Sequence, residues 1–107
     1  DNTEIIDLNL RGQKGVGADF KVMKGDEIIR LIEVKSTTDK FGQTLSISGT
    51  QWEIARNYFK LNDGDKYWIY CVFNAGTVNA EIVKIKNPIK KWKDGKLLAH
   101  PVNFIIK

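Results

Sequence analysis

Asp19, Glu33 and Lys35 are the residues whose types and spacing could do chemistry in this sequence. Glu33 and Lys35 end a segment, residues 28–35, that is otherwise mostly aliphatic. Alternate residues of a strand share one face, so these two side chains point the same way, one pleat apart. Burying most of a strand and presenting a carboxylate and an ammonium at its end is costly unless the charges pair or bind a ligand. A metal ion is one such ligand.

Asp19 comes fourteen residues before Glu33, in a second segment with the period of a strand. Residues 18–23 alternate apolar and polar side chains, as half-buried strands do. Residues 24–27 contain a glycine and three charged side chains, so they are expected to form the turn into the 28–35 strand. The two segments are therefore predicted to form an antiparallel hairpin.

The register of this hairpin decides whether Asp19 meets Glu33. With an even, symmetric turn, Asp19 lies on the wrong side of the sheet for Glu33. With an odd loop, or a bulge at Gly25, Lys24 opposes Ile28 and Asp19 opposes Glu33. Two opposed carboxylates repel each other, and a cation between them would make the pairing favourable. We therefore predict the odd register.

A helix follows this hairpin and is expected to bring a further polar side chain to it. Two overlapping capping boxes, Ser48 with Gln51 and Thr50 with Glu53, predict where the helix begins. The pattern continues to about Lys60. Helical spacing places Gln51 on the apolar face, which predicts that it points toward the sheet from the first turn.

A first strand is predicted at residues 1–10, where apolar and polar side chains alternate, and further strands at residues 44–47, 67–73, 79–85 and 102–106. The 67–73 run is almost continuously aromatic and β-branched, which is typical of a central strand covered on both faces. Residues 89–96 are basic and predict a turn or a short helix. The whole pattern predicts a mixed α+β (α/β) fold built on one sheet.

Length and composition limit the class of protein. A chain of 107 residues with 42% hydrophobic and 28% charged residues has the composition of one globular domain. Its apolar runs are too short to span a bilayer, and no charged and apolar leader opens it. Its single cysteine, Cys71, argues against a disulfide framework and is interpreted as a small buried hydrophobe. We expect a soluble, intracellular (cytoplasmic) domain with no membrane partner.

The net charge of +4 is unevenly distributed, because residues 84–107 hold seven lysines and one acidic residue. In this segment, three lysines flank the aromatic side chain of Trp92; they are Lys90, Lys91 and Lys93. Together these four residues could bind the phosphates of a nucleic acid. In the alternative interpretation, the lysines form a solvated edge that prevents aggregation and Trp92 is a packing anchor.

The pattern of an aspartate, thirteen intervening residues and Glu-x-Lys resembles the PD-(D/E)XK nuclease superfamily, also called restriction-endonuclease-like. Within it, GVGADF at 15–20, LIEVKS at 31–36 and QWEIA at 51–55 look like the domain family named after the C-terminal region of the plant protein NO VEIN. The resemblance covers about residues 5–74. It implies a restriction-endonuclease-like mixed β-sheet flanked by helices.

The resemblance also implies an activity, namely metal-dependent cleavage of nucleic acid, DNA in preference to RNA. Asp19 and Glu33 would be ligands of Mg²⁺ or Mn²⁺, with the carbonyl of Val34 as a third ligand. Lys35 would lie beside the scissile phosphate. Gln51 is similar to a glutamine at the helix start of several nuclease branches, and would orient the lysine or contact the nucleic acid backbone.

Other functions stay open at this point. Glu33 and Lys35 could form a simple ion pair and Gln51 could be only a helix cap. The domain could then be a non-catalytic nucleic-acid-binding or protein-docking module, or a purely structural one. The superfamily usually has an N-terminal helix, often with an active-site glutamate, whereas this chain starts at the first strand. We expect residues 1–107 to be a single domain of a larger protein, with this helix either in a preceding part or lacking.

Overall fold

The structure, a computed structural model, describes residues 2–9, 18–42, 45–99 and 103–106. The sequence of residues 11–17 is rich in glycine and predicts a turn, and this segment lies outside the described residues. In chain order the elements are β1 (Thr3–Asp7), β2 (Phe20–Lys24), β3 (Glu27–Ser36), β4 (Leu45–Ser46), α1 (Gly49–Lys60), the 3₁₀ helix η1 (Gly64–Lys66), β5 (Tyr67–Phe73), β6 (Glu81–Lys86), α2 (Pro88–Lys93), β7 (Leu97–Ala99) and β8 (Asn103–Ile106).

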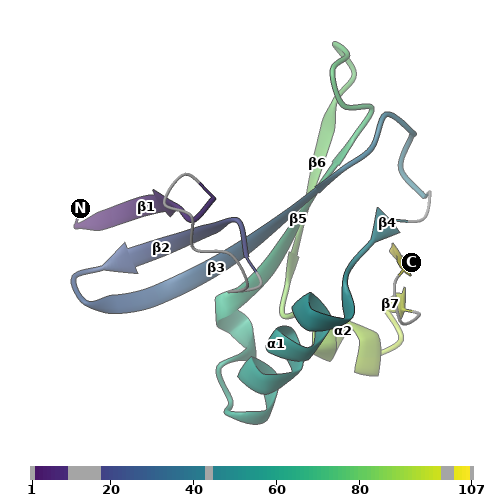
Figure 1. The fold of residues 1–107 in the computed structure, drawn as a ribbon. Coiled ribbons are helices and arrows are strands. Elements are labelled where there is room, and N and C mark those ends of the chain that lie inside the picture. The colour runs from purple at the N-terminus through teal and green to yellow at the C-terminus, as the bar shows by residue number, and fades with distance from the viewer. Residues whose placement is uncertain (1, 10–17, 43–44, 100–102, 107) are drawn as a thin grey trace.

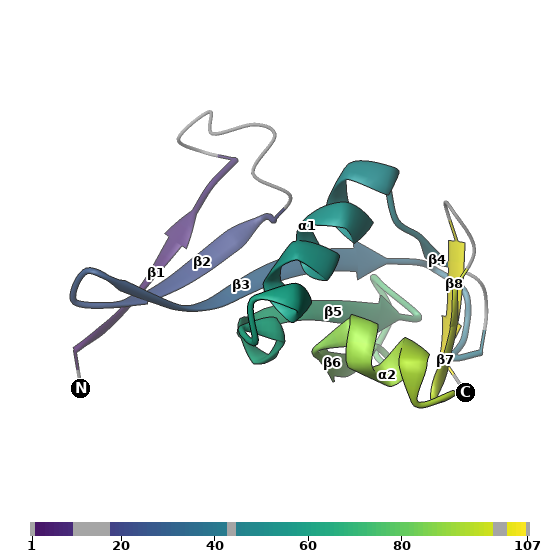
Figure 2. The ribbon, with the colours of Figure 1, turned by 90° about the horizontal axis from the view of Figure 1, so that it is seen from below.

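A five-stranded mixed sheet in the order β1-β2-β3-β5-β6 is the framework of the domain (Figure 1). Only β3 and β5 pair in parallel within it, and α1 provides the crossover that a parallel pair requires. Three short strands form a second sheet in the order β4-β8-β7. The strands β1 and β2 and the start of β3 extend beyond the two helices (Figure 2). The predicted mixed α+β fold is confirmed.

The core lies on one face of the five-stranded sheet. Burial alternates strictly along β5, where every second side chain is fully buried. The predicted coverage of both faces of residues 67–73 is therefore wrong. Trp68 and Tyr70 are only half-buried on the other face, where the guanidinium of Arg30 lies 3.9 Å from the centroid of the Trp68 ring. The prediction is wrong because the aromatic residues on that face make the sequence of β5 similar to that of a strand buried on both faces.

Cys71 belongs to the buried side of β5 and is a free thiol. Burial raises the pKa of this thiol to about 12, although the ammonium of Lys35 lowers it. The thiol is therefore protonated and unreactive at neutral pH, in agreement with its interpretation as a small hydrophobe. No helix in the described part of the chain is long and apolar enough to cross a membrane.

The β2–β3 hairpin turns differently from the prediction. Lys24 pairs with Glu27, so the turn has two residues, and Gly25 has a φ of 62°. Such a positive φ suits the first position of a type II′ hairpin turn. The predicted pairing of Lys24 with Ile28 and the predicted bulge at Gly25 are wrong. The extra residue is Ile29 on β3, opposite the step between Val22 and Met23 of β2.

The short elements outside the five-stranded sheet differ in part from the prediction. The strand predicted at 44–47 is β4, which pairs with β8 in the small sheet. The basic segment contains a short helix, α2, with proline in its first turn and Asn87 as its N-cap. The strand β7 was missed, because three residues are too few to show a period.

Gly64 lies against the buried side chain of Asn87. A Cβ atom at Gly64 would lie 2.6 Å from Nδ2 and 2.7 Å from Oδ1 of Asn87. This amide is fixed, because it donates to Asp65 at 3.1 Å and accepts from the N–H of Lys90 at 3.2 Å. We expect Gly64→Ala to lower the free energy of unfolding in urea by about 2 kcal/mol. Gly49→Ala, with open space at the Cβ position, is the control, and equal stability of the two variants would contradict this packing.

Candidate metal and phosphate site

Asp19 lies where β2 stops pairing with β3. Beyond the bulge, Phe20 pairs with Ile32, so the next residues in this register are Asp19 and Glu33, as the odd offset predicts. The ladder ends there. The N–H of Asp19 donates to the carbonyl of Ile32 at 2.9 Å, and Asp19 Oδ2 accepts from the N–H of Val34 at 2.8 Å. A side-chain carboxylate thus takes the place of a main-chain acceptor at the edge of β3.

The other oxygen of Asp19 is held by Asn9, a residue that the sequence analysis missed. Asn9 Nδ2 donates to Asp19 Oδ1 at 2.9 Å, and the N–H of Leu8 donates to the carbonyl of Asp19 at 2.9 Å. The first strand was predicted to continue past Asn9, which hid the turn that follows β1. Both carboxylate oxygens of Asp19 are therefore oriented by fixed donors.

Glu33, Lys35 and Gln51 form a closed triangle of polar contacts. Lys35 Nζ lies 3.1 Å from Glu33 Oε2 and donates to Gln51 Oε1 at 2.9 Å. Gln51 Nε2 donates to Glu33 Oε2 at 2.8 Å. Glu33 is only 3% exposed, so its charge depends on these two partners. The structure thus brings together the three residues that strand alternation and helical spacing predicted.

The first turn of α1 fixes the position of Gln51. Ser48 is the N-cap, and its Oγ accepts from the N–H of Gln51 at 3.1 Å. In return, Gln51 Oε1 accepts from the N–H of Ser48 at 3.0 Å, which completes the first of the two predicted capping boxes. The helix ends at Lys60, as predicted. Gln51 is therefore a helix cap and a member of the polar cluster at the same time.

The electrostatics of the cluster are dominated by burial. Burial raises the pKa of Glu33 above 4.5, and the nearby carboxylate of Asp19 raises it as well. The Lys35 ammonium and the Gln51 amide act in the opposite direction without cancelling the rise. The pKa of Tyr67 is also raised, first by burial and then by both carboxylates. Asp19 and Glu33 are thus near enough to influence each other, and added positive charge would stabilise both.

The residues present fit a hard divalent cation. Asp19 and Glu33 offer carboxylate oxygens, and Mg²⁺ and Mn²⁺ prefer oxygen ligands. The N–H and C=O of one strand residue point to the same edge, so the carbonyl of Val34 faces Asp19. Within the described ranges, no three His, Cys, Asp or Glu side chains could hold a metal together. Water or substrate oxygens would complete the coordination, and Glu33 would have to exchange contacts with Lys35 or Gln51.

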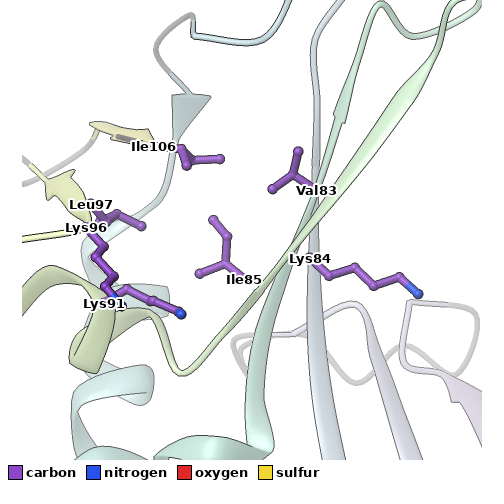
Figure 3. Close-up of a pocket in the computed structure, with 7 residues that line it drawn as sticks. All are labelled: Val83, Lys84, Ile85, Lys91, Lys96, Leu97 and Ile106. Carbon is purple, nitrogen blue, oxygen red and sulfur yellow. The ribbon is translucent and has the colours of Figure 1, made fainter. Parts of the chain in front are cut away.

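The four residues predicted to bind nucleic acid line three different cavities. Lys90 Nζ pairs with Asp94 Oδ2 at 2.8 Å. Lys91 lines a cavity of about 250 Å³ beside β6, into which Val83 and Ile85 point (Figure 3). Trp92 and Lys93 instead line a groove between α1 and α2, together with residues of α1. Trp92 and Lys93 thus share a cavity, whereas Lys90 and Lys91 line two others.

The fold and the cluster define a mixed α+β domain with an acidic pair, a lysine and a glutamine gathered where β2 ends beside β3. The chain belongs to the family described as "Protein NO VEIN, C-terminal", whose model matches residues 2–85. The matched range contains the whole cluster and ends before α2. The family resemblance is thereby confirmed over a longer range than the 5–74 predicted. No curated protein and no solved structure matches the chain.

Proposed function

We propose that this domain cleaves phosphodiester bonds of nucleic acid, DNA in preference to RNA, at a PD-(D/E)XK-type site that uses Mg²⁺ or Mn²⁺. The observation that carries the proposal is the convergence of four side chains from three elements. Asp19 comes from the position just before β2, Glu33 and Lys35 from one face of β3, and Gln51 from the first turn of α1. Two carboxylates and an ammonium so arranged can hold a cation and a phosphate together.

Each residue of the cluster has a role in this proposal. Asp19, Glu33 and the Val34 carbonyl would hold the cation, which when bound supplies a Lewis acid and lowers the pKa of a water. Lys35 would donate to the attacking water or to a phosphate oxygen, and so stabilise the negative charge that develops in the transition state. Gln51 would keep Lys35 and Glu33 in position through its two hydrogen bonds.

A cleavage assay tests the proposal. We expect the native protein to cut a labelled oligonucleotide in Mg²⁺ or Mn²⁺, and EDTA to stop it. Asp19→Asn keeps an acceptor for Val34 but loses a charged ligand, so cleavage should fall by at least about a hundredfold. Asp26→Asn removes the same charge at the exposed tip of the β2–β3 turn and should cleave normally. No metal-dependent cleavage of single-stranded DNA, duplex DNA or RNA by the native protein would contradict the proposal.

One observation favours a second function, a non-catalytic nucleic-acid-binding or protein-docking module. Glu33, Lys35 and Gln51 satisfy one another without a metal, and no buried side-chain polar atom in the described ranges lacks a hydrogen-bond partner. Such a closed cluster could serve only to hold the sheet and helix together. Nucleic-acid binding that is unchanged by EDTA, in a protein that never cleaves, would support this second function.

A further inference from the structure

One face of α1 carries a line of residues that begins in the same helical turn as Gln51. Trp52, Arg56 and Lys60 are spaced four residues apart, so they lie one above another on the helix surface. Trp52 directly follows Gln51, the residue that contacts Glu33 and Lys35. The line therefore starts in the turn that carries Gln51, on a different face of the helix, and runs toward the C-terminal end of α1.

The helix α2 faces this line across a groove. The rings of Trp52 and Trp92 meet edge to face, with centroids 5.9 Å apart and an interplanar angle of 77°. Lys93 Nζ lies 5.6 Å from the ring centroid of Phe59 and 5.8 Å from that of Trp92. Between the helices lies a cavity of about 190 Å³, with Ile89 in its lining. Trp92 is still 41% exposed, so part of its ring is open to a ligand.

The lining of this groove is cationic and aromatic. The described residues that line it include no acidic side chain; they are Arg56, Phe59, Lys60, Ile89, Trp92 and Lys93. Arg56 pairs with Glu53 at 3.2 Å, but both side chains are about half exposed. Such exposed pairs are weak, so a phosphate can replace the carboxylate.

We propose that this groove binds a single strand of nucleic acid, with phosphates at Arg56, Lys60 and Lys93 and a base against Trp92. The inference rests on the proposed function, because it names the form of substrate that reaches the cluster. The cavity is smaller than the roughly 300 Å³ or more of pockets for whole small molecules, so it suits one base of a longer strand. Cations that follow a backbone and an aromatic ring that stacks a base are the features by which proteins hold single strands. A duplex keeps its bases stacked inside and could offer one to Trp92 only at the cost of unpairing and unstacking it.

Fluorescence anisotropy in EDTA measures strand binding without cleavage. The probes are a labelled 15-nucleotide oligothymidine, an oligouridine of the same length and a 15-base-pair DNA duplex. The triple variant Arg56→Gln, Lys60→Gln, Lys93→Gln should bind the better single strand at least about tenfold more weakly, with a salt slope smaller by about 2, because each phosphate contact contributes roughly 0.7. Trp92→Leu should weaken binding by about fivefold or more.

A matched control is a second triple variant that loses the same charge at exposed lysines outside the groove, namely Lys24→Gln, Lys40→Gln and Lys84→Gln. It should bind within about twofold of the native protein if the groove, and not net charge, is responsible. Equal affinity and salt slope in the native protein and the groove triple variant would overturn the inference. It would also be overturned if the control lost as much affinity, or if the duplex bound more tightly than both single strands. Comparison of the affinities for the oligothymidine and the oligouridine shows whether the groove prefers DNA or RNA.

The groove and the nuclease activity can fail separately. Asp26→Asn should bind the strand like the native protein, because Asp26 lies outside both the groove and the polar cluster. Cleavage by the native protein, together with unchanged binding by the groove variant, would reject the groove alone. Groove-dependent binding without any cleavage would reject the nuclease alone.

Discussion

Lys35→Met is expected to lower the free energy of unfolding at pH 7 by about 3 kcal/mol in the absence of divalent cations. Glu33 is 3% exposed, and in the native protein the Lys35 ammonium lies 3.1 Å from its carboxylate. Methionine keeps most of the length of lysine, but it leaves the Gln51 amide as the remaining side-chain partner of this buried charge within the described part of the chain. Urea denaturation in EDTA measures the loss. The double variant with Glu33→Gln should recover most of it, because no buried charge then remains.

The loss in Lys35→Met should depend on pH in a defined direction. The ammonium of Lys35 lowers the pKa of Glu33, so its removal raises that pKa further above 4.5. A carboxyl whose pKa is raised in the folded state stabilises the fold below its unfolded pKa, and loses this contribution as pH rises through the folded pKa. The variant should therefore approach the native stability near pH 4 and fall behind it toward pH 7. An equal loss at both pH values would mean that Lys35 acts by packing and not by charge.

Glu33→Gln should have the opposite effects on stability and on activity. Burial raises the pKa of Glu33 even beside Lys35, so the neutral amide should increase the free energy of unfolding at pH 7. The gain should disappear below about pH 4.5, where the native carboxyl is itself protonated. Metal-dependent cleavage should fall at least about a thousandfold, because a charged ligand is lost. Active sites commonly trade stability for function in this way.

These two measurements on Glu33→Gln check each other. Denaturation midpoints across pH report the energetic cost of the buried carboxylate, and initial cleavage rates report its role. A variant that is less stable than the native protein at pH 7 would contradict the unfavourable burial of Glu33. A variant that still cleaves in Mg²⁺ would remove Glu33 from the proposed chemistry.

The sequence predicted the polar cluster well because its parts depend on local rules. Glu33 and Lys35 share a face because side chains alternate along any strand. The capping box of Ser48 and Gln51 fixes both the start of α1 and the direction of the glutamine. Both predictions need only a few neighbouring residues, and the structure confirms them.

The features that the sequence missed depend on distant partners. Several turn types fit residues 24–27, and the bulge at Ile29 is set by pairing along β2, not by the turn. The hydrogen bond of Asn9 to Asp19 spans the segment between β1 and β2. The groove between α1 and α2 depends on a contact of Trp52 with Trp92, forty residues apart. No local spacing in the sequence encodes such contacts.

Calorimetric titration of Mg²⁺ and of Mn²⁺ is the most direct test of a metal site at Asp19 and Glu33. The native protein should bind at least one divalent cation. Asp19→Asn should bind it at least about tenfold more weakly with an unchanged circular dichroism spectrum, and Asp26→Asn should bind it like the native protein. Absence of binding to the native protein, or equal binding to Asp19→Asn, would contradict a metal site formed by these two carboxylates.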